Sequence, residues 1–206
     1  MIKLLIFDYD GVIFDTEDVA YSLVRKECDK YCKIPIKTKD EFIWLYKSNF
    51  YDSMRERGVE KKDMEKIKKE SIKILSRKRL KAHQGIKNAV KLLSKTHTLA
   101  VISSNYDAVM KKNLKRQGIL DNFSFIFGTE EGENKQKKIK KLIKKAKASN
   151  AESVFITDTV GDIKEAKKAG IKTMAVTWGF HTRKMLAKAK PDFIAEKPAQ
   201  ILEVLA

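Results

Sequence analysis

The stretch IKLLIFDYDGVIFDT, residues 2–16, decides the fold expected of this chain. Its first part, residues 2–7, is a short and nearly continuous apolar run, which predicts a strand buried on both faces of a parallel sheet. The run ends in two carboxylates, Asp8 and Asp10, separated by Tyr9. Residues two apart in an extended chain point to the same side, so we expect both aspartates to face one cleft and Tyr9 to face away.

Two carboxylates this close repel each other unless a cation or a proton offsets their charge. A hard divalent cation such as Mg²⁺, which prefers oxygen ligands, is the natural counter-charge. Gly11 lets the backbone turn sharply out of the strand, and ligands of open α/β sheets bind beyond the carboxyl ends of the strands. The alternative is a solvated turn at residues 8–11, which would leave a second acidic cluster further along the chain unexplained.

Beyond residue 80, short apolar runs alternate with amphipathic segments. Strands are predicted at residues 99–103, 125–127, 154–157 and 171–177, and helices at residues 86–95, 108–117, 135–148 and 161–169. This alternation predicts an α/β fold with a doubly wound parallel, Rossmann-like sheet.

Residues 16–80 show helical patterns only, with a capping box at residues 38–41, a helix end at Gly58 and a long basic helix at residues 61–79. We interpret them as an all-helical cap domain inserted into a core of residues 1–15 and 81–206. The hinges are expected near residues 14–16 and 81–85.

Composition sets limits on the class of protein. At 206 residues, of which 43% are apolar, the chain can bury one core and a small accessory domain. We find no run long enough to cross a membrane and no signal peptide ahead of the first strand, so we expect a cytoplasmic protein without membrane partners. The net charge of +17 comes mostly from lysine on predicted helix faces and attracts anions, phosphorylated substrates included. A hot environment would also favour such a surface. We do not expect nucleic acid as the partner.

The two cysteines, Cys28 and Cys32, are four residues apart, which places both sulfurs on one face of a helix. A metal site would need further ligands, and the three histidines show no matching spacing. We therefore expect two reduced thiols on a partly buried helix face.

A second acidic cluster, TDTVGD at residues 157–162, also follows an apolar strand. Asp158 at the strand end could complete a metal site with Asp8, and Asp162 could hold a metal-bound water or an ammonium group. The alternative is that one aspartate only caps the next helix. Residues 103–105, Ser-Ser-Asn, offer a hydroxyl and free backbone N–H groups at a helix start, which suits an anion or a simple cap.

These segments resemble, in order, the signature motifs of the haloacid dehalogenase superfamily of phosphotransferases. DYDGVI at residues 8–13 resembles the first motif, and residues 103–105 resemble the second. Residues 157–162 resemble the fourth, with Thr157 where the family usually has glycine. Residues 177–180 (TWGF) and 191–194 (PDFI) further resemble the phosphoglycolate phosphatase-like branch. The resemblance covers almost the whole chain, the inserted helical cap included.

The resemblance implies roles for individual residues. The catalytic residues would be Asp8, Asp10 and Lys135. Phosphate would be bound by Ser103, Ser104, Asn105 and Gly11. Mg²⁺ would be bound by Asp8, Asp158 and the backbone carbonyl of Asp10, with Asp162 and Thr159 supporting the site. Because the proline that often follows the family's lysine is absent, Lys137 and Lys138 stay open as alternatives to Lys135.

The expected function is Mg²⁺-dependent hydrolysis of a small phosphate monoester by a phosphoric monoester hydrolase. Asp8 would form an aspartyl-phosphate, and Asp10 would act as acid and then base. A phosphosugar mutase is the alternative within the family, although the cap segment after Asp15 lacks the histidine that mutases typically carry. A basic nucleic-acid-binding protein with a vestigial site is the alternative from another class. The substrate, the cap residues that read it, and the choice between monomer and homodimer are not fixed by the sequence.

Overall fold

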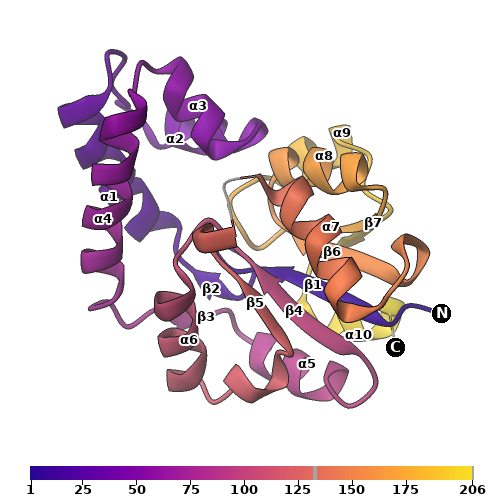
Figure 1. Ribbon diagram of the computed structural model, residues 1–206. Helices are drawn as coiled ribbons and strands as arrows, with labels where there is room; N and C mark the ends of the chain where they lie inside the picture. The colour runs from indigo at the N-terminus through magenta and orange to yellow at the C-terminus, as the bar shows by residue number, and fades with distance from the viewer. Residues whose placement is uncertain (132–133, 206) are drawn as a thin grey trace.

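The computed structural model describes residues 1–131 and 134–205, and it shows a parallel sheet with helices on both faces and a helical unit beside it (Figure 1). The sheet has the strand order β5-β4-β1-β6-β7-β8, and every pairing in it is parallel. Its strands are β1 (Leu4–Asp8), β4 (Thr98–Ile102), β5 (Phe125–Phe127), β6 (Ser153–Thr157), β7 (Lys172–Val176) and β8 (Phe193–Ala195). The predicted doubly wound α/β fold class is confirmed.

The first strand, β1, lies in the middle of the sheet and is buried along its whole length. Leu4 and Ile6 pack against the helices on one face, and Leu5 and Phe7 pack against those on the other. The same alternation sends Asp8 toward the first face. Tyr9 is fully buried in the cluster on the second face, so it points away from Asp8 as predicted.

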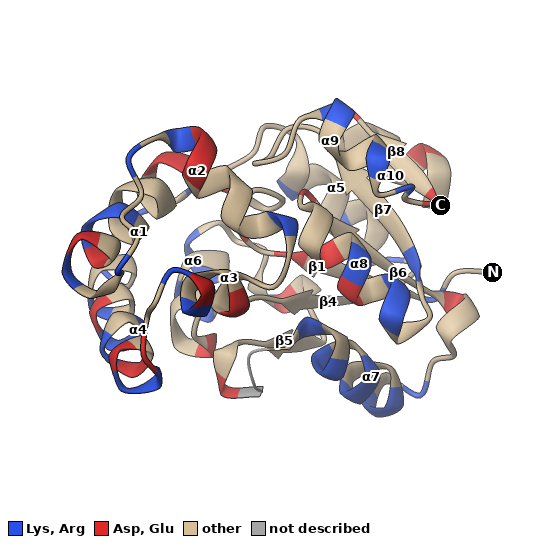
Figure 2. Cartoon of the chain, turned by 90° about the horizontal axis from the view of Figure 1, so that it is seen from above, with Lys and Arg blue, Asp and Glu red and all other residues tan. Residues whose placement is uncertain are grey.

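Each face of the sheet has its own set of helices. On the Leu4 side these are α7 (Lys135–Ala146) and α8 (Val160–Ala169), with α9 (Arg183–Lys188) packed beside α8. On the Leu5 side they are α5 (Ile86–Leu93), α6 (Asp107–Arg116) and α10 (Pro198–Leu205). Short 3₁₀ turns occur at Leu120–Asn122, Thr129–Glu131 and Asn150–Glu152. Lysines run along α7 (Figure 2), which accounts for part of the basic charge.

Four further helices form the unit that we call the helical unit: α1 (Glu17–Tyr31), α2 (Lys39–Trp44), α3 (Phe50–Glu56) and α4 (Lys61–Leu75), with a 3₁₀ turn at Leu45–Lys47 after α2. They share a hydrophobic cluster of their own around Phe42 and Met54. At the start of α2, the Thr38 hydroxyl accepts from Glu41 N at 3.2 Å as predicted. The Glu41 carboxylate instead accepts from Lys37 N, at 2.7 Å.

The chain enters and leaves the helical unit through two short paired strands, β2 (Phe14–Asp15) and β3 (Lys81–Ala82), which are antiparallel. The sequence does not indicate this ribbon, because two-residue strands are too short for a periodic pattern. The long basic helix α4 also ends at Leu75, earlier than predicted, and α9, β8 and α10 were not predicted. Across the described residues, no helix combines the length and apolarity that crossing a membrane requires.

The expectation of two reduced thiols is wrong, because Cys28 and Cys32 form a disulfide. Helix α1 ends at Tyr31, and Cys32 adopts an extended conformation (φ −89°, ψ 137°). The backbone therefore leaves the helix at Cys32, and the two Cα atoms lie 4.5 Å apart, within the range for a disulfide.

Candidate active site

The predicted site residues meet at the carboxyl edge of the sheet, where β1, β4 and β6 end side by side. One pocket is lined by residues from all three strand ends, from the start of α7 and from the helical unit. The predicted residues in its lining are Asp8, Asp10, Ser103, Ser104, Asn105, Lys135, Asp158, Thr159 and Asp162. Segments more than one hundred residues apart in the chain therefore build a single site.

Lys135 begins α7 and bridges two carboxylates. Its Nζ donates to Asp8 Oδ2 and to Asp162 Oδ2, both at 2.7 Å. Burial works against the ammonium charge, but the two aspartates outweigh it and raise the pKa of Lys135 above its ordinary value. Burial likewise opposes ionisation of Asp162, yet the contact with Lys135 lowers the pKa of that carboxyl. Lys135 is thus a permanent positive charge next to Asp8.

The two alternative lysines lie elsewhere. Lys137 is exposed to solvent. Lys138 is fully buried, but its Nζ donates to the carbonyls of Ser103 (2.6 Å) and Gly128 (2.9 Å) and so supports the loop after β4. Of the three candidates, the structure brings Lys135 to the carboxylates.

The loop after β4 holds the side chain of Asp10. Asn105 Nδ2 donates to Asp10 Oδ2 at 2.6 Å, and Ser103 Oγ donates to the same oxygen at 3.4 Å. The Asn105 N–H donates to Ser103 Oγ at 2.9 Å, which orients that hydroxyl. Burial raises the pKa of Asp10 and favours its protonated form. Ser104 contributes its carbonyl, which accepts from the Tyr51 hydroxyl of the helical unit at 3.2 Å.

Asp158 follows β6 and is completely buried. Its Oδ2 accepts from Phe180 N at 2.7 Å, whereas its Oδ1 has no hydrogen-bond partner among the described residues. Gly11 (φ +70°) and Gly179 lie so close that a Cβ at either position would overlap the Asp158 carboxylate. Burial, with a contribution from Asp162, raises the pKa of Asp158 to about 7.

The site holds more carboxylates than its ammonium can offset, since Lys135 contacts two of the four, Asp8 and Asp162. Burial also raises the pKa of Asp8, and Asp162 and Asp158 add to this effect although Lys135 opposes it. The unpartnered Oδ1 of Asp158 and this excess charge suit a divalent cation bound by oxygen ligands. Within the described residues, no three acidic, histidine or cysteine side chains are grouped as metal ligands. A cation would therefore need a backbone oxygen as well, as in the predicted set that includes the Asp10 carbonyl.

Thr159 lines the pocket and also caps the helix that follows it. Its hydroxyl accepts from Asp162 N at 3.3 Å and so caps α8. The alternative in which an aspartate caps this helix is therefore wrong, because a threonine does so. Both carboxylates of the second acidic cluster are left to face the site.

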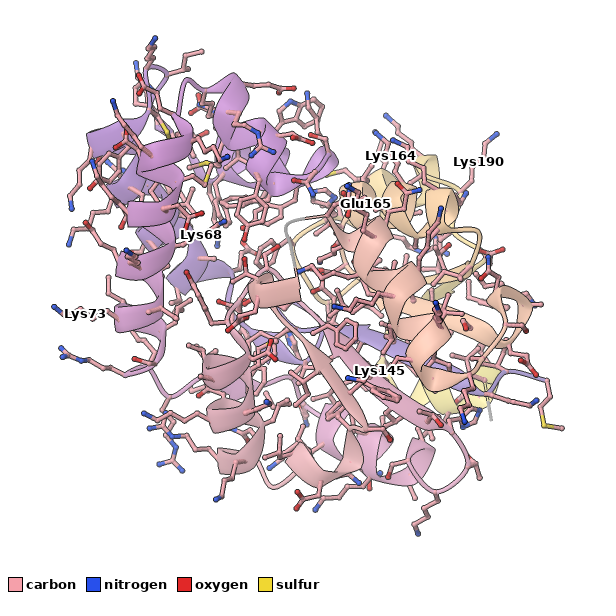
Figure 3. The ribbon with its side chains drawn as sticks, in the orientation of Figure 1. Lys68, Lys73, Lys145, Lys164, Glu165 and Lys190 are labelled. Atoms are coloured by element: carbon pink, nitrogen blue, oxygen red, sulfur yellow. A yellow bond between two sulfur atoms is a disulfide. The ribbon has the colours of Figure 1, made fainter. Side chains whose placement is uncertain are left out.

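The helical unit contacts α8 through side chains that the sequence motifs do not predict. Glu165 Oε1 accepts from Asn49 Nδ2 at 2.8 Å, and its Oε2 accepts from Lys135 N at 2.8 Å. Figure 3 shows Lys164 and Glu165 on the part of α8 that lies beside the helical unit, and Lys164 Nζ donates to Lys47 O at 3.2 Å. Glu165 is three residues after Asp162, so the shared helix face was a possible signal. Nothing in the sequence pointed to Asn49.

His181 makes a second such link. It is fully buried, and its Nδ1 accepts from Val160 N at 2.9 Å. The proton therefore sits on Nε2, which donates to Ile43 O in α2 at 3.0 Å. Because neutral imidazole is needed for this pair of bonds, burial and the lowered pKa of His181 agree with the geometry.

The central strand of the parallel sheet ends in paired aspartates, beside a buried lysine and a hydroxyl–amide loop. This is the arrangement expected of the predicted phosphatase class. Residues 5–176 match the haloacid dehalogenase-like hydrolases, and the chain belongs to that family. The predictions of family and enzyme class are confirmed.

Relatives extend the comparison over the full chain. A phosphoglycolate phosphatase of Synechococcus elongatus is 23% identical over 208 residues, covering 98% of this chain and 97% of the relative. A pyrophosphatase PpaX of Listeria welshimeri is 23% identical over 217 residues, covering 99% and 96%. The structure of a haloacid dehalogenase-like hydrolase family protein from Streptococcus pneumoniae is similar, with a TM-score of 0.81, 20% identity and coverage of 100% and 99%. This structural likeness shows the shared fold.

Proposed function

We propose that the protein is a Mg²⁺-dependent phosphatase that hydrolyses a small phosphate monoester through an aspartyl-phosphate at Asp8. The observation that supports the proposal most strongly is that these side chains meet at the end of β1. The Asp8 carboxylate accepts a hydrogen bond from the Lys135 ammonium, and the Asp10 carboxylate accepts hydrogen bonds from Ser103 and Asn105. One pocket thus holds side chains that could serve as nucleophile, acid and phosphate-binding groups, which supports the proposal. The names of the relatives support phosphate chemistry of this kind.

In the first step, an Asp8 oxygen attacks phosphorus in line with the ester oxygen, so that an O–P bond to Asp8 forms as the ester O–P bond breaks. Asp10 begins protonated, as the raised pKa favours, and gives its proton to the departing alkoxide. In the second step, Asp10 takes a proton from water, which attacks phosphorus and releases phosphate from Asp8. Splitting the displacement in this way makes both halves easier.

The other residues of the site stabilise charge. Lys135 offers a fixed ammonium to the phosphoryl oxygens, and Ser103 and Asn105 offer hydrogen-bond donors. A Mg²⁺ ion bound by Asp8, Asp158 and the Asp10 carbonyl would supply further positive charge to the phosphoryl group. Removing one such electrostatic partner typically lowers the rate by about 10²–10³-fold.

We also propose that residues 16–80 form the cap over a core of residues 1–15 and 81–206. The separate hydrophobic cluster of the helical unit and the β2–β3 ribbon at its base support this division. The contacts of Glu165 with Asn49 and of His181 with Ile43 would hold the cap against the core and keep water from the reacting phosphoryl group.

Phosphate release from p-nitrophenyl phosphate, measured with Mg²⁺ and with EDTA, tests the proposal. Activity should need Mg²⁺ and should be lost in Asp8→Asn, while Asp121→Asn, a change of the same kind at an exposed position, should behave as wild type. Full activity of Asp8→Asn would refute the covalent mechanism.

A further inference from the structure

The pocket that contains Asp8 and Asp10 continues into the helical unit, between α1 and α4. Its walls there are mostly apolar and include Leu23, Val24, Ile67, Ile72 and Leu75. A phosphate group needs none of these side chains, because the charged residues of the core already surround it. The apolar extension is therefore placed to receive the remainder of a substrate.

The apolar extension is longer than a small leaving group such as glycolate. Ala20 and Glu27 both line the pocket from α1. With a rise of 1.5 Å for each helical residue, they lie about 10 Å apart along the helix. A leaving group that contacts this wall over its whole length has a body several carbon atoms longer than that of glycolate.

One charged side chain of this wall is buried without a partner. Glu27 is only 1% exposed, and neither of its carboxylate oxygens has a hydrogen-bond partner in the described part of the chain. Its neighbour Glu70 is already engaged by Lys30 Nζ at 3.0 Å and by the Tyr31 hydroxyl at 3.3 Å. A buried carboxylate without partners is costly, and native proteins rarely keep one. A donor supplied by a ligand would remove this cost.

We propose that the substrate's leaving group has an extended apolar body with a hydrogen-bond donor, an ammonium or a hydroxyl, at the end far from the phosphate, and that Glu27 binds this donor. This inference rests on the phosphatase function proposed above. Burial and the nearby Glu70 carboxylate raise the pKa of Glu27 to about 7, although Lys30 and Lys26 oppose this effect. A carboxylate or a second phosphate at that end of the substrate would be repelled.

Lys68 is the competing determinant, since it also lines the pocket and could bind an anionic leaving group (Figure 3). Its ammonium already pairs with Glu65 at 3.0 Å and lies 5.0 Å from the centre of the Tyr51 ring. Charge complementarity therefore favours Glu27 over Lys68 as the residue that selects the leaving group. The experiment below distinguishes the two residues.

The test compares kcat/KM for alkyl phosphates that share a six-carbon chain and differ in the group at its far end. Aminohexyl, hydroxyhexyl and carboxyhexyl phosphate carry an ammonium, a hydroxyl and a carboxylate there, and hexyl phosphate carries no polar group. Wild type should prefer the first two. In Glu27→Gln, kcat/KM for aminohexyl phosphate should fall on the order of 10- to 100-fold, mainly through KM, because a charge-assisted hydrogen bond is lost. The fall should be much smaller for hexyl phosphate and p-nitrophenyl phosphate, which offer Glu27 no hydrogen-bond donor. Asp29→Asn, an exposed change on the same helix, is the matched control.

Calorimetric binding of aminohexyl and hexyl phosphonate to wild type and Glu27→Gln gives a readout without turnover. Selective loss of aminohexyl phosphonate binding in the variant would support the proposal, whether or not the enzyme hydrolyses these esters. If no phosphate ester were hydrolysed, only the proposed phosphatase function would be refuted. A preference for carboxyhexyl phosphate that Lys68→Met removes would overturn the inference. So would an equal loss for all ligands in Glu27→Gln, which would mark Glu27 as a purely structural residue.

Discussion

The unpartnered carboxylate of Glu27 should make the stability of the protein depend on pH. Burial, with a contribution from Glu70, raises its pKa from an ordinary 4.5 to about 7, although Lys30 and Lys26 partly oppose the change. A carboxyl whose pKa is raised by folding binds its proton more tightly in the folded state. Its contribution to stability is therefore complete below pH 4.5 and is lost as the pH rises through 7.

Glu27→Gln isolates this effect, because the amide has nearly the same shape and does not ionise. A pKa difference of this size corresponds to about 3 kcal/mol. The free energy of unfolding of Glu27→Gln, relative to wild type, should rise by that amount between pH 4.5 and pH 8. Whatever the buried amide costs in itself is the same at both pH values, so the change with pH carries the test.

Urea unfolding followed by far-ultraviolet circular dichroism at several pH values gives these free energies. The exposed Asp29→Asn variant should differ from wild type by a nearly constant amount over the same range. A constant difference for Glu27→Gln as well would mean that the Glu27 carboxylate is hydrated or paired in solution. That result would refute the reasoning about its burial.

Three other predictions follow from buried or tightly packed groups. Burial, with a contribution from Lys135, lowers the pKa of Lys138 to about 8. Because the unfolded chain then binds the proton more tightly, the free energy of unfolding of wild type should rise by about 3 kcal/mol relative to Lys138→Met between pH 8 and pH 10.5. Urea unfolding measures this difference. Gly179→Ala should displace the Asp158 carboxylate and raise the Mg²⁺ concentration for half-maximal activity on the order of tenfold, measured by Mg²⁺ titration of phosphate release. Asn49→Asp should place a like charge against Glu165, loosen the contact of the helical unit with α8 and raise KM several-fold in steady-state kinetics. Because an aspartate can still cap α3 as Asn49 does, the effect should come from the lost contact with Glu165.

Local sequence patterns predicted much of the fold and most of the residues that meet at the strand ends of the site. An apolar run before Asp8 and another before Asp158 predicted buried parallel strands, and the carboxyl ends of neighbouring strands must meet at one edge. Alternation along β1 predicted that Tyr9 turns away from Asp8, which its burial in the opposite cluster confirms. These features follow from residues close in sequence, so a pattern can reveal them.

The remaining features depend on tertiary packing. The link from Asn49 to Glu165 joins residues 116 positions apart, and no local pattern specifies such a pair. Glu27 looks in the sequence like one more solvated charge on a helix that carries both signs, and its burial appears only in the folded structure. Helical spacing brought Cys28 and Cys32 together, but their oxidation depended on where the helix ended.

The most direct measurement asks whether phosphate becomes attached to Asp8. With p-nitrophenyl phosphate as substrate, the Asp10→Asn variant should accumulate the aspartyl-phosphate intermediate. The p-nitrophenolate leaving group needs no acid, so the intermediate still forms, but the attacking water lacks its base, so hydrolysis of the intermediate is slow. Borohydride reduction of an acyl phosphate converts the aspartate to homoserine, which peptide mass spectrometry locates. We predict homoserine at position 8. Turnover that leaves Asp8 unmodified, or a label on Asp158 instead, would contradict the account.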